Sequence, residues 1–164
     1  MQTFLPYRSF QESAKCLDRA RLGKQRIEAF DILVINEGIK PDFMSDIQFE
    51  YINKRYKNHP AVLMWKGYPY TLYDYTKVIC LEWQRRGYKG VTLERLEQYL
   101  TSIVTKIKAE PTYPDWLKYS DSNGLCLSHK SNLLRKSSSH YRPIFGQNIP
   151  DNLPYYWPVT KDTI

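Results

Sequence analysis

The sequence predicts an all-α fold: a compact single-domain helical bundle with a long first helix, an extended N-terminal arm and an extended aromatic C-terminal tail. Apolar residues recur at three- and four-residue spacing in several stretches, and we find no stretch with the alternation typical of a strand. The chain has 164 residues, of which 42% are hydrophobic. This length and composition suit one domain, residues 1–164, that buries a core of its own.

The first helix is expected to begin at Ser9 or Ser13, to run to about Asn36 and to end near Gly38. Successive residues of a helix are rotated by about 100°. The apolar side then carries Leu22, Ala29, Phe30 and Leu33, with Ile27 and Val34 at its edge. The opposite side carries Asp18, Arg21, Lys24, Gln25 and Glu28. We therefore expect the first side to face the core and the second to face solvent or a ligand.

Two residues of this helix break the pattern. Arg26 falls in the middle of the apolar side, where an unpaired charge costs several kcal/mol, so it requires a partner. That partner is either a carboxylate, in a structural salt bridge, or a phosphate of a ligand. Gly23 lowers helix stability by up to about 1 kcal/mol relative to Ala, and it leaves room for another group to come close.

Further helices are predicted along the chain. Their ranges are 46–56, 61–66 with Pro60 at the start, 70–86, 92–109 and 128–136. The first of these ends in a small basic cluster at residues 54–57. Residues 116–123 read as loop or a short turn, and the tail from Ser137 is expected to be extended over the body. Trp65 and Trp83 are expected in the core.

The charge balance favours a polyanionic partner. Lys and Arg number 24 against 17 Asp and Glu, the net charge is +7, and aromatic residues make up 15% of the chain. Positive charge interleaved with stacking surfaces suits nucleic acid better than a membrane surface. No apolar run approaches the roughly 18 residues of a membrane helix, and the N-terminus has no signal-peptide pattern. Three scattered cysteines suit reduced thiols, so we expect a cytoplasmic protein.

Three segments, in order, resemble the phage-type endonuclease V family, the pyrimidine-dimer DNA glycosylases. Residues 22–28, Leu-Gly-Lys-Gln-Arg-Ile-Glu, are similar to a Leu-Gly-Glu-His-Arg-Glu segment on that family's first helix. His59 and residues 65–88 are similar to a His-led segment and a helix ending Lys-Arg-Gly-Phe. Residues 131–136 are similar to a Ser-Arg-Leu-Leu-x-Lys segment. The chain looks closer still to a bacterial and phage branch that begins Met-Gln-Thr-Phe-Leu-Pro-Tyr, so the resemblance implies the cytoplasm of a bacterial cell or of a phage-infected host.

The resemblance implies a compact helical fold, removal of a damaged pyrimidine and strand cleavage at the abasic sugar. In the family the nucleophile is the α-amine of the first residue, which forms an imine, and a glutamate assists. An α-amine titrates near pH 8 and a lysine near about 10.4, so more of the α-amine is neutral at physiological pH. The resemblance implies no metal and no cofactor, and a monomer that acts on double-stranded DNA with a damaged or abasic site.

Two departures from the family affect the catalytic residues. A long Gln2 follows Met1 and disfavours removal of Met1, so the amine is expected on Met1, or on Gln2 if Met1 is removed. In the ungapped register Ile27 stands where the glutamate belongs, and Glu28 lies one step further on. Either Glu28 takes the role or the lyase chemistry is altered. The catalytic candidates are Met1, Gln2 and Glu28.

The expected DNA contacts come from the three matching segments and the cations beside them. They are Arg21, Lys24, Arg26, His59, Lys130, Asn132, Arg135 and Lys136. Asn132 stands where the family has an arginine. Tyr155, Tyr156 and Trp157 either stack on bases or cover a groove. Two other interpretations remain: a non-catalytic DNA-binding protein on the same scaffold, and a different nucleic-acid or nucleotide enzyme.

Overall fold

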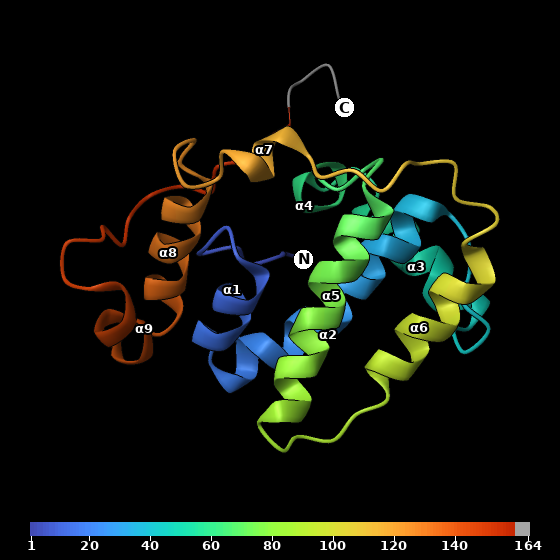
Figure 1. The fold of residues 1–164 in the computed structure, drawn as a ribbon, viewed down its shortest axis with the longest axis horizontal. Coiled ribbons are helices and arrows are strands. Elements are labelled where there is room, and N and C mark those ends of the chain that lie inside the picture. Colours follow the sequence, from blue (N-terminus) through green and yellow to red (C-terminus); the bar gives the residue numbers. More distant parts are fainter. Residues whose placement is uncertain (160–164) are drawn as a thin grey trace.

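Helices α2 (Arg19–Glu37) and α5 (Pro69–Arg85) pack side by side at the centre of the structure and form its most extensive helix–helix contact (Figure 1). The structure is a computed structural model that describes residues 1–159. Over these residues all regular secondary structure is helical, which confirms the predicted all-α class. None of the helices described is both long and apolar enough to cross a lipid bilayer.

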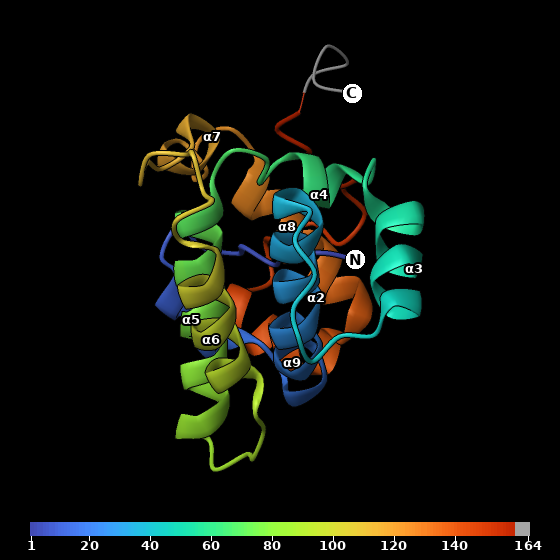
Figure 2. The ribbon, with the colours of Figure 1, turned by 90° about the vertical axis from the view of Figure 1, so that its right-hand side faces the viewer.

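Seven shorter helices surround the central pair within residues 1–159. They are α1 (Phe10–Cys16), α3 (Asp46–Tyr56), α4 (Pro60–Leu63), α6 (Thr92–Ile103), α7 (Asp115–Lys118), α8 (Leu125–Lys136) and α9 (Ser138–Phe145). Helices α1 and α6 pack on α5, whereas α3 and α4 pack on α2. Helices α8 and α9 contact each other and close the side of the bundle next to the N-terminal arm (Figures 1 and 2).

The predicted long first helix is in fact two helices, α1 and α2. The chain is extended at Leu17 and Asp18, and the Asp18 carboxylate caps α2 by accepting a hydrogen bond of 2.9 Å from the Arg21 backbone N–H. The Tyr141 hydroxyl donates to the same carboxylate at 2.8 Å. Because Asp18 caps α2 and is itself held by Tyr141, the chain cannot continue as one helix through this point, and α1 ends before it. The predicted boundaries hold: Ser9 caps α1, and α2 ends at Gly38 with φ +65°.

Two other predicted elements need correction. Helix α6 ends at Ile103 rather than near residue 109. The helix ends there because the run Ile103, Val104 and Thr105 is β-branched and has weak helix propensity. The tail from Ser137 is not extended throughout, because its first residues form α9 and only its described remainder after Phe145, residues 146–159, lacks regular structure. Tyr141 on α9 is fully buried, and Phe145 stacks on it with ring centroids 5.5 Å apart. This packing keeps α9 helical despite Pro143 inside it.

The N-terminal arm runs into the middle of the molecule rather than over its surface. Figure 1 places the N-terminus near the centre of the molecule, between α8 and α5, and Figure 2 places it beside α2, in front of α8 and α9. Phe4 and Leu5 are buried, and the Thr3 hydroxyl accepts a hydrogen bond of 2.9 Å from the indole N–H of Trp65 in the core. The expected ordered arm is therefore present, and it is part of the core.

Candidate active site

A cavity of about 520 Å³ lies where the N-terminal arm, α2, α8 and the tail meet. Its walls combine the chain's first residues, one carboxylate, three cations and several aromatic rings. The lining residues are Met1, Gln2, Phe4, Ala20, Arg21, Lys24, Gln25, Glu28, His59, Lys136, Tyr155 and Trp157. Most of the predicted site residues therefore meet around one space, although they come from four separate parts of the chain.

The α-amine of Met1 and the carboxylate of Glu28 face each other in this cavity. The amine nitrogen lies 3.9 Å from Glu28 Oε1, and the Glu28 side chain is one-quarter exposed. This distance is at the outer limit of an ion pair, so each group keeps free hydrogen-bonding capacity toward the cavity. An amine and a carboxylate that open onto one space can act on the same atom of a ligand.

Gln25 fixes the position of the arm, although the sequence placed it on the solvent side of the helix. Its side-chain N–H donates to the Gln2 carbonyl at 2.9 Å, and its Oε1 accepts from the Phe4 N–H at 2.8 Å. The hydroxyl of Tyr75 lies 2.7 Å from the same Oε1. Gln25 is fully buried because the arm covers this side of α2. A buried polar residue that satisfies two backbone groups two residues apart acts as a clamp.

A second clamp comes from α8. His129 is fully buried and accepts the Leu5 N–H on Nδ1 at 2.7 Å, which leaves its Nε2 as the protonated nitrogen. Burial lowers the pKa of His129 to about 3, so the ring is neutral at ordinary pH. Its edge meets the rings of Phe4 and Tyr155. The sequence interpretation had given His129 no role, and the structure makes it a support for the arm.

His59, which the resemblance marks as a DNA contact, also lines the cavity. Its Nδ1 accepts the Ala61 N–H at 3.1 Å and so caps α4, and its ring contacts those of Tyr56 and Trp157. Burial, and to a smaller degree the positive charge of the α-amine, lowers the pKa of His59 below its usual value. The ring is therefore neutral at pH 7 and reaches the cavity without adding charge to it.

Three cations surround the amine and the carboxylate. The guanidinium of Arg21 donates to the Lys136 carbonyl at 3.2 Å and pairs with Asp18 at 3.2 Å, so it joins α2 to the end of α8. The ammonium of Lys136 lies 5.9 Å from the centre of the Phe4 ring. Lys24 is exposed one turn before Glu28. This charge makes the cavity suitable for an anionic ligand.

Arg26 lies on another side of α2 and does not line this cavity. Its guanidinium carbon is 4.1 Å from the centre of the Trp83 ring, and Nη1 donates to the Thr92 hydroxyl at 3.1 Å. Its partner is thus an aromatic face rather than a carboxylate. Trp83 is half-buried, not a full core residue, and it packs against Gly23, where an added Cβ would lie 3.1 Å from its ring. Because Gly23 has no side chain, the Trp83 ring can pack directly against this position of α2, which agrees with the room that the sequence predicted there.

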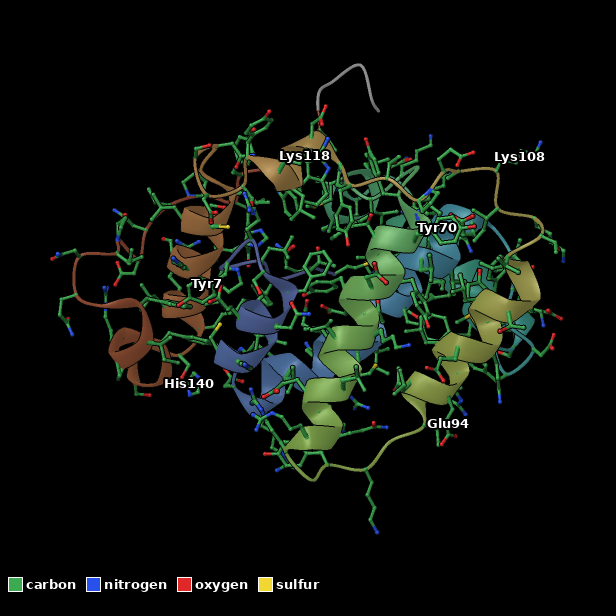
Figure 3. All side chains as sticks on the ribbon, viewed as in Figure 1. Tyr7, Tyr70, Glu94, Lys108, Lys118 and His140 are labelled. Atoms are coloured by element: carbon green, nitrogen blue, oxygen red, sulfur yellow. The ribbon has the colours of Figure 1, made fainter. Side chains whose placement is uncertain are left out.

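The remaining predicted DNA contacts on α8 lie away from the cavity. The ammonium of Lys130 sits 4.5 Å from the centre of the Tyr7 ring, which Figure 3 shows between α1 and α8. Asn132 and Arg135 bond to each other and hold the tail. Arg135 Nη1 donates to the Asp151 and Leu153 carbonyls at 2.9 and 2.8 Å. Through this attachment Tyr155 and Trp157 reach the cavity wall.

The helical fold thus places the α-amine of Met1 beside the Glu28 carboxylate, in a cavity that three cations also line. The model of the pyrimidine dimer DNA glycosylase family matches residues 1–95, which include the arm, α2, His59 and α5. The chain belongs to this family of DNA repair glycosylases, whose substrate is DNA. The comparisons with curated proteins and with solved structures gave no match.

Proposed function

We propose that the protein is a DNA glycosylase with abasic-site lyase activity, that it removes a damaged or modified pyrimidine from duplex DNA, and that the α-amine of Met1 is its nucleophile. One observation carries the proposal: the amine lies 3.9 Å from the Glu28 carboxylate in a cavity bordered by Arg21, Lys24 and Lys136. The Gln25 and His129 clamps support it, because a nucleophile on a chain end needs a fixed arm to act at one place.

The chemistry assigns a separate task to each group. The neutral amine attacks C1′ of the damaged nucleotide, the glycosidic bond breaks, and the base leaves with its bonding electrons and takes up a proton. The Glu28 carboxylate stabilises the positive charge that develops on the sugar and accepts the proton lost by the amine. Opening of the sugar ring gives an imine. Loss of a C2′ proton then expels the 3′ phosphate and cleaves the strand.

The cations and the aromatic rings account for binding. Arg21, Lys24 and Lys136 can each neutralise a phosphate beside the damaged nucleotide. The reacting carbon of a paired nucleotide is hidden in the duplex, so the nucleotide has to leave the stack, at a cost of a few kcal/mol that is lowest at a damaged site. Tyr155 and Trp157 border the cavity and can stack on an exposed base.

The proposal requires Met1 to be the first residue of the mature chain. Gln2 cannot replace it without rearrangement, because its carbonyl is held by Gln25 and its side-chain oxygen accepts the Thr3 N–H at 2.8 Å. Intact mass measurement of the mature protein decides which residue carries the amine. A chain that begins at Gln2 would carry its amine one residue further along the arm, away from the position that the Met1 amine occupies beside Glu28.

Borohydride trapping tests the proposal. The protein is incubated with a duplex that contains an abasic site, and with one that contains pyrimidine dimers, in the presence of borohydride, and base release is measured in parallel. We expect a covalent protein–DNA complex, and we expect Glu28→Gln to bind DNA but to release base more slowly. Base release without trapping would indicate an activated water instead of the amine. Binding with neither reaction would favour the non-catalytic DNA-binding protein.

A further inference from the structure

The exposed side of α3 carries cations that the cavity does not use. Its acidic residues, Asp46 and Glu50, lie in its first half, and Asp46 pairs with Lys40 at 3.1 Å. Lys54, Arg55 and Lys57 follow at its C-terminal end, and all three are exposed. Over the described part of the chain, none of these three lies within ion-pair distance of a carboxylate. This end of α3 is therefore a purely basic surface.

Aromatic residues hold Arg55 in place at this surface. Its guanidinium donates to the Tyr51 hydroxyl at 2.7 Å, and its central carbon lies 5.6 and 5.4 Å from the ring centres of Tyr51 and Tyr56. Tyr51 is 53% exposed, so its ring and hydroxyl lie at the surface together with the Arg55 guanidinium. The arrangement holds the guanidinium in a defined place while most of its donors remain free for a phosphate.

An unbroken series of rings connects this surface with the cavity. Tyr56 contacts His59 with ring centroids 6.4 Å apart, His59 contacts Trp157 at 5.8 Å, and Trp157 contacts Tyr155 at 5.4 Å. His59, Trp157 and Tyr155 line the cavity. The basic end of α3 is thus continuous with the cavity wall rather than a separate patch on the molecule.

The figures show how α3 stands relative to the amine. In Figure 1, α3 and α8 lie on opposite sides of the N-terminus. In Figure 2, the N-terminus emerges between α2 and α3, with α9 behind it. A duplex centred on the amine therefore meets Lys136, at the end of α8, on one side and α3 on the other.

We infer that the basic end of α3, formed by Tyr51, Lys54, Arg55 and Lys57, binds the phosphate backbone of the duplex on one side of the damaged site. This inference rests on the proposed function, because the cavity sets the position of the damaged nucleotide. Cations in the last turn also interact favourably with the helix dipole. That interaction explains neither the exposed Tyr51 that holds Arg55 nor Lys57, which lies beyond the last residue of α3.

The test replaces two of these cations and measures DNA binding at several salt concentrations. Each phosphate contact contributes about 0.9 to the slope of log K against log salt, so Lys54→Gln with Arg55→Gln should reduce the slope by about two. The matched control is Lys106→Gln with Lys108→Gln, which removes two exposed cations from the segment between α6 and α7. Figure 3 labels Lys108, and Figure 2 shows this segment on the side of the molecule opposite the N-terminus. The control should leave the slope unchanged.

The side of contact is tested with two duplexes whose abasic site lies near one end or near the other. The wild-type protein should bind more tightly to the duplex whose long flank extends toward α3, and the α3 double variant should lose most of this preference. Equal slopes for the wild type and the α3 variant, with both proteins folded by thermal melting, would overturn the inference. Borohydride trapping reports separately on the proposed chemistry: a variant with a reduced slope that still traps at saturating DNA supports both conclusions. If the α3 variant shows a reduced slope but neither it nor the wild type is trapped, the result supports the DNA-binding surface on α3 and not the proposed chemistry.

Discussion

Substitution of Gln25 by leucine tests whether this buried side chain on α2 holds the N-terminal arm in place. Leucine has a similar volume but no hydrogen-bonding group, so Gln25→Leu leaves the Gln2 carbonyl and the Phe4 N–H without their partners. Each buried group that loses its partner costs about 1–3 kcal/mol, which gives about 2–6 kcal/mol for the two. Tyr75 remains satisfied, because its hydroxyl also lies 3.0 Å from the Phe4 carbonyl.

This loss is comparable to the free energy by which burial of apolar side chains stabilises the docked arm. Burial of an aromatic or leucine side chain contributes about 1.5–3 kcal/mol, so Phe4 and Leu5 together contribute about 3–6 kcal/mol. The released state of the arm should then gain population, although the hydrogen bonds of Leu5 to His129 and of Trp65 to Thr3 still favour the docked state. We expect the rate of borohydride trapping to fall at least about tenfold, which needs only about 1.4 kcal/mol. DNA affinity should change little, because Arg21, Lys24 and Lys136 do not belong to the arm.

Asn36→Leu is the matched control on the same helix. Asn36 donates to the Val62 carbonyl at 3.0 Å and so joins α2 to α4 instead of the arm. The Asn36→Leu substitution should lower the melting temperature but leave the rate of borohydride trapping unchanged. Amide hydrogen exchange at residues 3–5 should rise in Gln25→Leu and not in Asn36→Leu. Trapping by Gln25→Leu at the wild-type rate, or equal losses in both variants, would refute the role of Gln25 as the clamp of the arm.

Three further outcomes follow from other sites. Burial, and less so Glu28, raises the pKa of Asp31 to about 6 from 3.8. The buried charge therefore destabilises the fold as pH rises from about 4 to 6, and Asp31→Asn should stabilise it at pH 7 by up to about 3 kcal/mol but not at pH 3.5, as measured by chemical denaturation. The pKa of His129 is lowered from 6.5 to about 3, so stability is full above pH 6.5 and falls as pH drops toward 3, and His129→Asn should flatten that acid limb in thermal melts. Arg135→Ala should increase hydrogen exchange at residues 151–157 and leave the salt slope of DNA binding within error, since its guanidinium is occupied by tail carbonyls.

The main helices could be predicted because their signals are local. The apolar stripe and the terminal residues Ser9 and Gly38 predict most of α1 and α2 correctly. What they do not predict is the break at Asp18. That break depends on Tyr141, which is 123 residues away and cannot be recognised from the neighbourhood of Asp18. Helix α9 was missed for a related reason, since Pro143 argues against a helix and only the packing of Tyr141 and Phe145 keeps it.

The candidate site could be predicted in part. The shared face of Arg21, Lys24 and Glu28 follows from helical spacing, and the resemblance pointed to Met1 and His59. Gln25 could not be placed, because a helix projection assigns a polar residue to solvent unless another segment covers it. Lys130, Asn132 and Arg135 look like a free basic face in the sequence, yet the structure engages them with Tyr7 and the tail. Such partners become visible only when distant parts of the chain meet.

The central claim, that the α-amine of Met1 is the nucleophile, is tested most directly by mapping the trapped adduct. The protein is reacted with an abasic duplex and borohydride and digested, and the modified peptide is sequenced by mass spectrometry; acetylated protein serves as the control. We expect the sugar adduct on the α-amine of Met1, and no adduct after acetylation of that amine while DNA binding persists. An adduct on Lys24, or undiminished trapping by the acetylated protein, would contradict it.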